Sequence, residues 1–156
     1  MKILVDADSC PRPARELILR TAQRRGVLAI FAANRLIPGI GGSESSDGEF
    51  ARMELCPAGA DSADNRIVEL AEEGDLVITR DIPLASRLVE ASIAVIDDRG
   101  QAYSRENIRE RLSLRDFMVD LAESGLGMER IPSYGKRELK AFADGFDRIL
   151  TKLLKG

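Results

Sequence analysis

The 156-residue chain contains no histidine, no tryptophan and only two cysteines. The absence of histidine excludes Ser-His-Asp and Cys-His catalysis, acid–base chemistry by imidazole, and every metal site that needs a histidine ligand. Cys10 and Cys56 do not form a Cys-x-x-Cys pair, and we expect both to be buried thiols. Catalysis by this chain would therefore depend on carboxylates, hydroxyls, arginine and lysine.

Aromatic residues and long apolar runs are also scarce. Aromatic side chains make up 4% of the chain, which leaves little for a platform that stacks nucleic-acid bases. The formal net charge is −3, although 23 lysines and arginines could still form a local basic patch. No apolar run approaches the roughly 20 residues of a membrane-spanning helix, and the N-terminus does not resemble a leader peptide. We therefore predict a cytoplasmic protein with no membrane partner.

The order of apolar runs and periodic segments predicts an α/β fold. We expect strands over residues 2–5, 27–33, 51–57, 75–79 and 92–97. We expect helices over residues 11–26, 62–74, 81–91, roughly 104–124 and 136–154. Strands that alternate with helices predict a three-layer sandwich with a mainly parallel central sheet, followed by C-terminal helices. We interpret the chain as one domain, with an α/β core over residues 1–98, a helical extension over residues 99–156 and a mobile loop over residues 39–49.

Aspartates follow most of the predicted strands. Ligands of an open parallel sheet bind outside the carboxyl ends of its strands, so an aspartate that follows a strand is a candidate site residue. Asp75 precedes its strand, which places it at the opposite edge. The aspartates that follow strands are Asp6, Asp8, Asp61, Asp64, Asp81, Asp97 and Asp98.

Many of these aspartates have a second explanation, because aspartate often caps a helix. Asp61 and Asp81 stand at capping positions, and Asp8 or Ser9 could cap the first helix. Capping does not explain Asp6, which ends the first strand itself. Several carboxylates at one sheet edge would repel one another unless they were protonated or neutralised by a cation. Mg²⁺ or Mn²⁺ would suit ligands that are all oxygen atoms.

Four segments, in this order, resemble the bacterial YaiI/YqxD family of uncharacterised proteins: VDADSCP, GADSADNRI, GDLVITRDIPLA and RGQAYSRENI. The resemblance extends from residue 2 to about residue 118. That family is regarded as distantly related to PIN domains, whose nucleases hold Mg²⁺ or Mn²⁺ with acidic residues at the carboxyl edge of the sheet. The resemblance therefore implies a PIN-like domain and a site built from carboxylates.

The resemblance also assigns roles to particular residues. Asp6 matches the first PIN acid and Asp81 the acid of the T-x-D motif, while Asp64 or Asp61 would stand for the mid-chain acid. PIN domains usually have glutamate at that mid-chain position, and aspartate has a shorter reach. Asp8 belongs to the YaiI/YqxD motif and not to the general PIN pattern.

These assignments predict a Mg²⁺- or Mn²⁺-dependent phosphodiesterase, with RNA expected as its substrate ahead of DNA. Asp6, Asp64 and Asp81 would be the catalytic residues and metal ligands. Asp8 and Asp61 would assist metal binding through water or from a second layer. A water molecule would attack phosphorus, while the cation and an arginine stabilise the added negative charge.

Four further side chains are candidates for substrate contacts: Asn34, Thr79, Arg12 and Arg80. Arginine is suited to bidentate contacts with phosphate. Each candidate also has a structural explanation, since the arginines could lie on solvated helix faces beside glutamates. Asn34 could start a turn, and Thr79 could be an ordinary β-branched strand residue.

Two other functions stay open. The protein could bind a cation, a nucleotide or a partner protein without catalysis. Haloacid-dehalogenase-like phosphatases also open with an apolar strand and Asp-x-Asp, as in Asp6-Ala7-Asp8. Those enzymes need a lysine to balance the phosphoaspartate, and none of the five lysines lies between Thr79 and Asp97.

Overall fold

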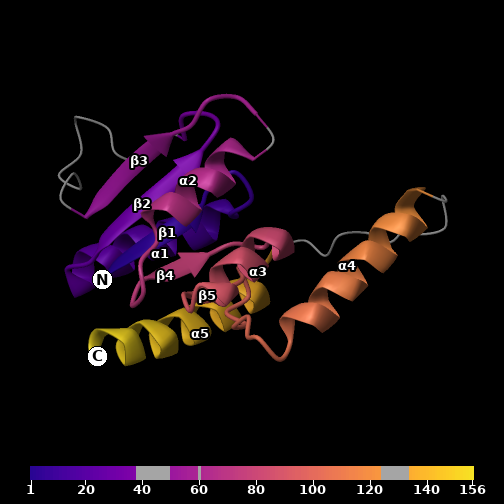
Figure 1. The fold of residues 1–156 in the computed structure, drawn as a ribbon. Coiled ribbons are helices and arrows are strands. Elements are labelled where there is room, and N and C mark those ends of the chain that lie inside the picture. The colour runs from indigo at the N-terminus through magenta and orange to yellow at the C-terminus, as the bar shows by residue number, and fades with distance from the viewer. Residues whose placement is uncertain (38–49, 60, 124–133) are drawn as a thin grey trace.

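The fold is a five-stranded parallel sheet between two layers of helices. The computed structural model describes residues 1–37, 50–59, 61–123 and 134–156. All strand pairs in this part of the chain are parallel, and the strand order is β3-β2-β1-β4-β5. The strands are β1 (Lys2–Asp6), β2 (Leu28–Ala33), β3 (Ala51–Leu55), β4 (Leu76–Ile78) and β5 (Ala94–Ile96). The predicted α/β class is confirmed (Figure 1).

Helices cover both faces of the sheet. The helices α1 (Arg12–Arg25) and α5 (Lys136–Leu154) pack on one face, and α2 (Ser62–Leu70) and α3 (Ile82–Glu90) pack on the other. Proline in the first turn of α1 and a left-handed Gly26 after its last turn set the two ends of that helix. This arrangement confirms the predicted three-layer sandwich.

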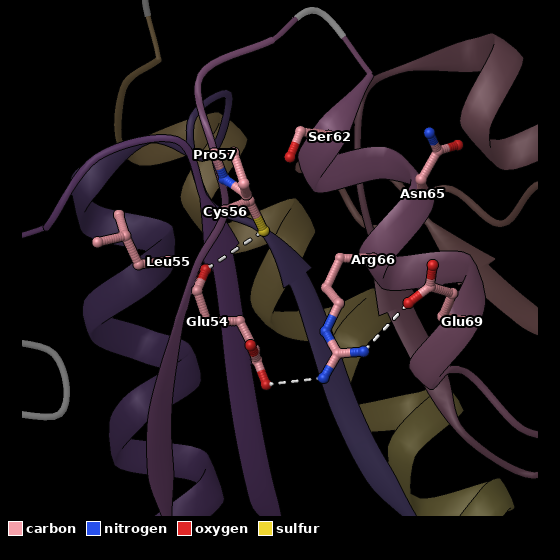
Figure 2. Close-up of a pocket in the computed structure, with 8 residues that line it drawn as sticks. All are labelled: Glu54, Leu55, Cys56, Pro57, Ser62, Asn65, Arg66 and Glu69. Carbon is pink, nitrogen blue, oxygen red and sulfur yellow. Dashed lines mark hydrogen bonds and ion pairs between the residues drawn. The ribbon is translucent and has the colours of Figure 1, made fainter.

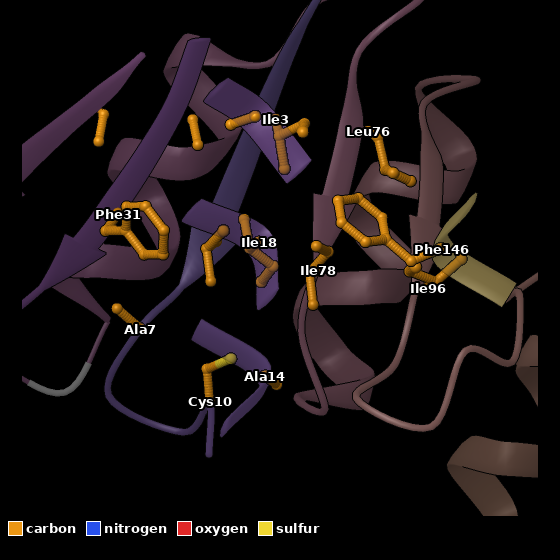
Figure 3. Packing of buried hydrophobic residues seen from close by; sticks show 14 of the residues in the cluster. Ile3, Ala7, Cys10, Ala14, Ile18, Phe31, Leu76, Ile78, Ile96 and Phe146 are labelled. Atoms are coloured by element: carbon orange, nitrogen blue, oxygen red, sulfur yellow. The ribbon is translucent and has the colours of Figure 1, made fainter. Parts of the chain in front are cut away.

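The core consists of two hydrophobic clusters separated by the sheet. Side chains of a strand alternate between faces, so Ile3 and Val5 pack toward α1 and α5, whereas Leu4 packs toward α2 and α3. Figure 3 shows part of the first cluster, to which β2 contributes Phe31 and α1 contributes Ile18. Because both faces are covered, the strands are almost continuously apolar.

The C-terminal helix α5 is fixed to the loop after β5 by two glycines. Gly100 has a φ of 79°, and a Cβ at this position would clash with the carbonyl oxygen of Ala141. A Cβ at Gly145 would overlap the backbone of Gly100. Backbones can approach this closely only where both residues lack a side chain. The contact fixes the middle of α5 to the loop that follows β5.

The helix α4 (Ile108–Glu123) differs from the other helices because it projects away from the sheet (Figure 1). Its exposed side includes Leu114, Phe117, Met118 and Val119. No helix in the part of the chain that the structure describes has the length and apolar character needed to cross a membrane.

Several predicted boundaries are wrong by a few residues. The helix expected over residues 62–74 ends at Leu70, since the Asp75 carboxylate accepts a hydrogen bond from the Glu72 N–H and fixes a turn there. The helix expected from residue 104 begins at Ile108. Ser104 and Asn107 exchange side-chain-to-backbone hydrogen bonds just before it and form a turn. The strand expected over residues 51–57 ends at residue 55, and the loop expected over residues 39–49 lies outside the described residues.

Candidate functional site

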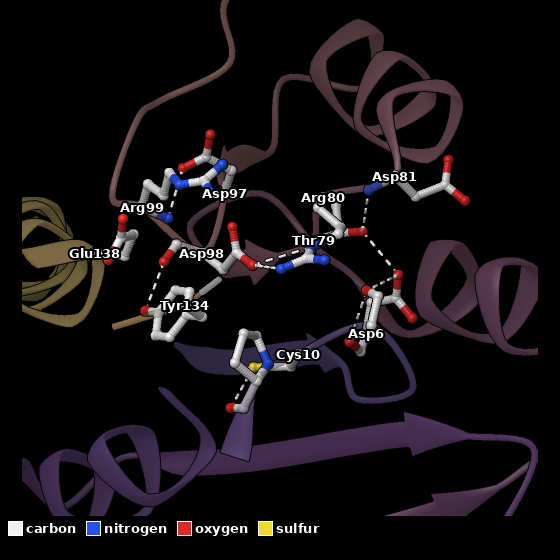
Figure 4. A network of polar contacts seen from close by, with 12 residues as sticks. Asp6, Cys10, Thr79, Arg80, Asp81, Asp97, Asp98, Arg99, Tyr134 and Glu138 are labelled. Carbon is white, nitrogen blue, oxygen red and sulfur yellow. Dashed lines mark hydrogen bonds and ion pairs between the residues drawn. The ribbon is translucent and has the colours of Figure 1, made fainter. Parts of the chain in front are cut away.

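Asp6 lies at the centre of the carboxyl edge. It ends β1, the middle strand of the sheet, and only 7% of the residue is exposed. Its Oδ2 accepts hydrogen bonds from Thr79 Oγ1 at 2.8 Å and Ser9 Oγ at 3.1 Å (Figure 4). Burial raises the pKa of Asp6, the two hydroxyl bonds oppose that rise, and repulsion from Asp81 and Asp8 adds to it.

Thr79 connects the ends of β1 and β4. Its buried hydroxyl donates to Asp6 and accepts a hydrogen bond from the Asp81 N–H at 2.9 Å. Asp81 caps α3, as predicted, because its Oδ1 accepts from the Leu84 N–H at 3.1 Å. Both the backbone N–H and the side chain of Asp81 are therefore hydrogen-bonded, and the Thr79 hydroxyl links Asp81 to Asp6 at the end of β1.

Asp64 brings a third carboxylate to this edge from the first turn of α2. Burial raises the pKa of Asp64 to about 7, and repulsion from Asp81, Asp6 and Asp61 contributes to the rise. When protonated, the Asp64 carboxyl donates a hydrogen bond to Asp81, which raises its pKa further. We call Asp6, Asp64 and Asp81 the acidic centre. Within the described residues, no arginine or lysine forms an ion pair with any of these three carboxylates.

The chemistry of the acidic centre fits a hard divalent cation. Its donors are carboxylate oxygens, and Mg²⁺ or Mn²⁺ is the metal that such donors suit. In the described ranges, however, no three acidic or thiol side chains are already arranged closely enough to hold an ion. A cation at Asp6, Asp64 and Asp81 would have to draw these side chains together and displace the proton of Asp64.

Asp8 and Asp61 lie at the margin of the acidic centre. Both residues are exposed. Asp8 accepts a hydrogen bond from the Asn34 N–H at 2.9 Å, and its Oδ1 lies 3.7 Å from Arg35 Nε. Asp61 stands at the N-cap position of α2 but makes no side-chain capping bond. Its proximity to Asp64 is nevertheless enough to contribute to the raised pKa of that residue.

The prediction that Asp8 or Ser9 caps the first helix is wrong. Pro11 occupies the N-cap position of α1, and no side chain caps that helix. Ser9 instead donates its hydroxyl hydrogen bond to Asp6. The Ser9 hydroxyl thus contacts the end of β1, and α1 has no side-chain cap of the kind that the sequence suggested.

The four substrate candidates have different surroundings. Arg12 is exposed and pairs with Glu16 at 3.1 Å, in agreement with the solvated-helix alternative. Asn34 is exposed, and its Nδ2 donates to the Gly59 carbonyl at 3.5 Å. Thr79 is buried against Asp6, so its contacts are with the acidic centre. Arg80 lies between the acidic centre and a second group of charges.

The second group consists of two aspartates that follow β5 and of the two arginines that pair with them. Asp97 and Asp98 are 6% and 5% exposed. Arg111 Nη2 donates to Asp97 Oδ2 at 3.0 Å. The Arg80 guanidinium donates through Nε and Nη2 to Asp98 Oδ2 (Figure 4). Asp97 Oδ1 also accepts hydrogen bonds from the backbone N–H groups of Arg99 and Gln101.

These residues surround a cleft of about 230 Å³, which we call the arginine cleft. The Arg111 guanidinium carbon lies 4.1 Å from the centre of the Tyr103 ring. Tyr103 donates through its hydroxyl to the Thr79 carbonyl at 3.3 Å, and Tyr134 donates to the Asp98 carbonyl at 2.7 Å. The cleft is lined by Arg80, Asp97, Asp98, Arg99, Tyr103, Arg111 and Tyr134.

A separate pocket of about 360 Å³ lies between β3 and α2 (Figure 2). Arg66 crosses it and pairs with Glu54 at 3.4 Å and Glu69 at 3.1 Å. The buried Cys56 also lines it, and both cysteines are free and buried, as predicted. The pocket is lined by two glutamates and one arginine, which leaves one negative charge in excess, and it contains no residue of the acidic centre.

Sequence reasoning did not find several residues of these sites. The position of Ser9, three residues after Asp6, was a usable signal, because a hydroxyl at that spacing can reach back to the strand end. Tyr103, Arg111 and Tyr134 had no comparable signal. Their positions depend on how α4 and α5 pack, which no local pattern predicts.

The fold and the acidic centre together define a three-layer α/β protein with clustered carboxylates at the carboxyl edge of its sheet. Residues 4–152 match a family model described as "Uncharacterized BCR, YaiI/YqxD family". A "UPF0178 protein" of Treponema pallidum is 46% identical, over 99% of this chain and 84% of that one. A protein with the same designation from Syntrophobacter fumaroxidans is 47% identical, over 99% of this chain and 97% of that one. Another from Pseudomonas entomophila is 40% identical over the full length of both chains. The chain belongs to the YaiI/YqxD family, which confirms the predicted membership, and no solved structure matches it.

Proposed function

We propose that this protein is a Mg²⁺- or Mn²⁺-dependent phosphodiesterase that cleaves RNA. The proposal is carried by the acidic centre, in which carboxylates from three βα units repel one another with no ion-paired cation among the described side chains. A divalent cation would relieve this repulsion. The likeness to PIN nucleases, drawn from the sequence, supports the phosphodiester substrate and the choice of RNA.

Each residue of the centre has a role in this proposal. Asp6, Asp64 and Asp81 would hold the cation, which when bound would supply charge neutralisation at a phosphodiester oxygen and activation of water. Thr79 is a positioning residue, because one hydroxyl fixes both Asp6 and Asp81. Arg80, held in place by Asp98, would donate to the negative charge that develops on phosphorus oxygens. Asp8 and Asp61, exposed at the margin, would order water around the ion.

The test combines metal binding with cleavage. Mn²⁺ is titrated calorimetrically into the metal-free protein and into Asp6→Asn, Asp64→Asn and Asp81→Asn, with Asp144→Asn on the exposed face of α5 as the matched control. We expect each substitution in the centre to weaken Mn²⁺ binding by about 10- to 100-fold and the control to leave it unchanged. Asp6→Asn should lower the rate of RNA cleavage by about 100-fold or more.

Asp6→Asn should fold normally, because the amide oxygen of asparagine can still accept the hydroxyl hydrogen bonds from Thr79 and Ser9. Thermal unfolding checks this point, and a modest increase in stability is expected because one of several like charges is removed. Cleavage by Asp6→Asn at the wild-type rate would refute the proposed mechanism.

The two alternatives give different results in the same experiments. A protein that binds a cation without catalysis would show Mn²⁺ binding that depends on the acidic centre but no RNA cleavage. A haloacid-dehalogenase-like phosphatase would form a beryllium fluoride adduct at Asp6, whereas a pure metal ligand would not. Lys2, one candidate for the lysine of such an enzyme, pairs with Asp75 at the opposite edge of the sheet, which argues against that alternative.

A further inference from the structure

The arginine cleft carries more positive charge than its carboxylates neutralise. Arg80 and Arg111 are paired with the buried Asp98 and Asp97, respectively. Arg99 also lines the cleft, and within the described residues its guanidinium forms no hydrogen bond or ion pair. Among the residues that line the cleft, three arginines against two aspartates leave one positive charge in excess, and the Glu138 carboxylate outside the lining lies near Arg99 without pairing with it (Figure 4). An anion is therefore the kind of ligand that the cleft attracts.

The cleft is also held rigid before any ligand arrives. Arg111 is fixed by Asp97 on one side and by the face of the Tyr103 ring on the other. Arg80 is fixed by two N–H groups that donate to Asp98. An arginine has five N–H donors, so these contacts leave three donors on Arg80 and four on Arg111 for a ligand. Preorganised donors of this kind lower the entropic cost of binding.

The donors and the size of the cleft select the ligand. Guanidinium groups match the oxygens of phosphate, and three of them suit a phosphate monoester dianion better than a diester, which has one charge and two free oxygens. The volume of about 230 Å³ is below the range of about 300–1,000 Å³ typical of small-molecule sites. Both tyrosine hydroxyls are already bonded to backbone carbonyls, which leaves them poorly placed to recognise a base. We propose that the arginine cleft binds a phosphate monoester, the terminal phosphate of an RNA strand.

The cleft lies beside the acidic centre. Arg80 lines both the cleft and a narrow space beside Asp6 and Thr79. A terminal phosphate held by Arg80, Arg99 and Arg111 would therefore place the strand beside the acidic centre and set the distance of the cut from its end. This use of the phosphate rests on the proposed function, whereas phosphate binding itself does not.

Binding in metal-free buffer with EDTA tests the cleft apart from any cleavage. Labelled oligoribonucleotides that carry a 5′-phosphate, a 3′-phosphate or no terminal phosphate are compared by fluorescence anisotropy. We expect the wild type to bind one phosphorylated form about tenfold more tightly than the unphosphorylated RNA. Arg99→Gln should bring this ratio close to one, and it should fold normally because no other described residue forms a hydrogen bond or ion pair with the guanidinium. Arg109→Gln, which alters an exposed arginine of α4 outside the cleft, should keep the ratio.

Further measurements distinguish an RNA end from a free nucleotide as the source of the phosphate, and phosphate binding from RNA cleavage. Calorimetry that compares uridine 5′-monophosphate with uridine tests whether the cleft binds the phosphate of a free nucleotide. Tighter binding of the monophosphate that is lost in Arg99→Gln would support phosphate binding by the cleft even if RNA ends are not distinguished. Equal binding of phosphorylated and unphosphorylated ligands by the wild type would overturn the proposal, as would an equal loss in Arg99→Gln and Arg109→Gln. Asp6→Asn should retain the phosphate preference, so a failure to cleave RNA and a failure to bind phosphate are distinguishable.

Discussion

The acidic centre and the arginine cleft both contain aspartates at the carboxyl edge of the sheet, but these aspartates have different partners. Asp97 and Asp98 are buried, and each has an arginine. Asp6 is buried to a similar degree but has hydroxyl partners and neighbouring carboxylates. Burying a charge is costly unless it is neutralised. The comparison indicates that Asp97 and Asp98 maintain the structure, whereas among the described residues no arginine or lysine pairs with the carboxylates of the acidic centre.

The largest expected effect comes from breaking an ion pair beside the cleft. Arg111→Met keeps an apolar side chain near Tyr103 but leaves the buried Asp97 carboxylate without its guanidinium. We expect the free energy of unfolding to fall by about 2–3 kcal/mol, measured by urea denaturation. Arg109→Met, an exposed change on the same helix, is the control and should cost less than about 0.5 kcal/mol. If the two variants were equally stable, Asp97 would not depend on Arg111.

A smaller effect is expected at Asp6, whose carboxylate is hydrogen-bonded by hydroxyl groups and not by an arginine. Thr79→Val keeps the shape of the side chain but removes the donor to Asp6 and leaves the Asp81 N–H without its acceptor. The free energy of unfolding should fall by about 1–2 kcal/mol, and Thr79→Ser should restore most of it. The loss of its hydroxyl donor should also raise the pKa of Asp6 further, which NMR titration of the carboxyl carbon would detect.

The smallest effect concerns pH and distinguishes the two groups directly. The pKa of Asp64 is raised from 3.8 to about 7, so the folded protein binds more protons than the unfolded chain between these values. The free energy of unfolding should therefore fall as pH rises from about 4 to about 7, by up to about 1 kcal/mol after solvent screening of this partly exposed group. Asp6, whose pKa is also raised, contributes with the same sign.

Denaturation of the metal-free protein across this pH range measures the slope. Asp64→Asn should flatten it, while Asp144→Asn, at an exposed position on α5, should not change it. Saturating Mn²⁺ should also reduce the fall in stability, because a bound cation favours the ionised carboxylates. A slope that is the same in wild type and Asp64→Asn would show that the acidic centre is not the origin of the pH dependence.

The sequence was sufficient to predict the sheet and its acidic edge for a physical reason. Apolar runs of strand length, separated by periodic helices, specify a parallel sheet, and the residue after each strand must then lie at the carboxyl edge. Asp6 ends β1, Asp81 follows β4 and Asp64 lies in the first turn of the helix after β3, so all three lie near that edge, whereas Asp75 precedes β4 and lies on the opposite side. This rule requires no knowledge of side-chain contacts.

The rule could not predict which carboxylates are neutralised. The pair between Arg111 and Asp97 forms because α4 begins at Ile108, after a turn at Ser104 and Asn107, and thereby directs Arg111 back toward β5. The pair between Arg80 and Asp98 joins the ends of two adjacent strands, and charge alone would equally have allowed Arg80 to approach Asp81. Such choices depend on tertiary packing, which local patterns do not contain.

The contact between Gly100 and Gly145 has a consequence for protein synthesis. Tyr134 lines the arginine cleft immediately before α5, and α5 closes on the loop after β5 only when Gly145 reaches Gly100. A ribosome that has translated all five strands has therefore not yet produced the segment that completes the cleft. The described lining of the cleft is therefore complete only after the C-terminal residues have been synthesised and α5 has packed against that loop.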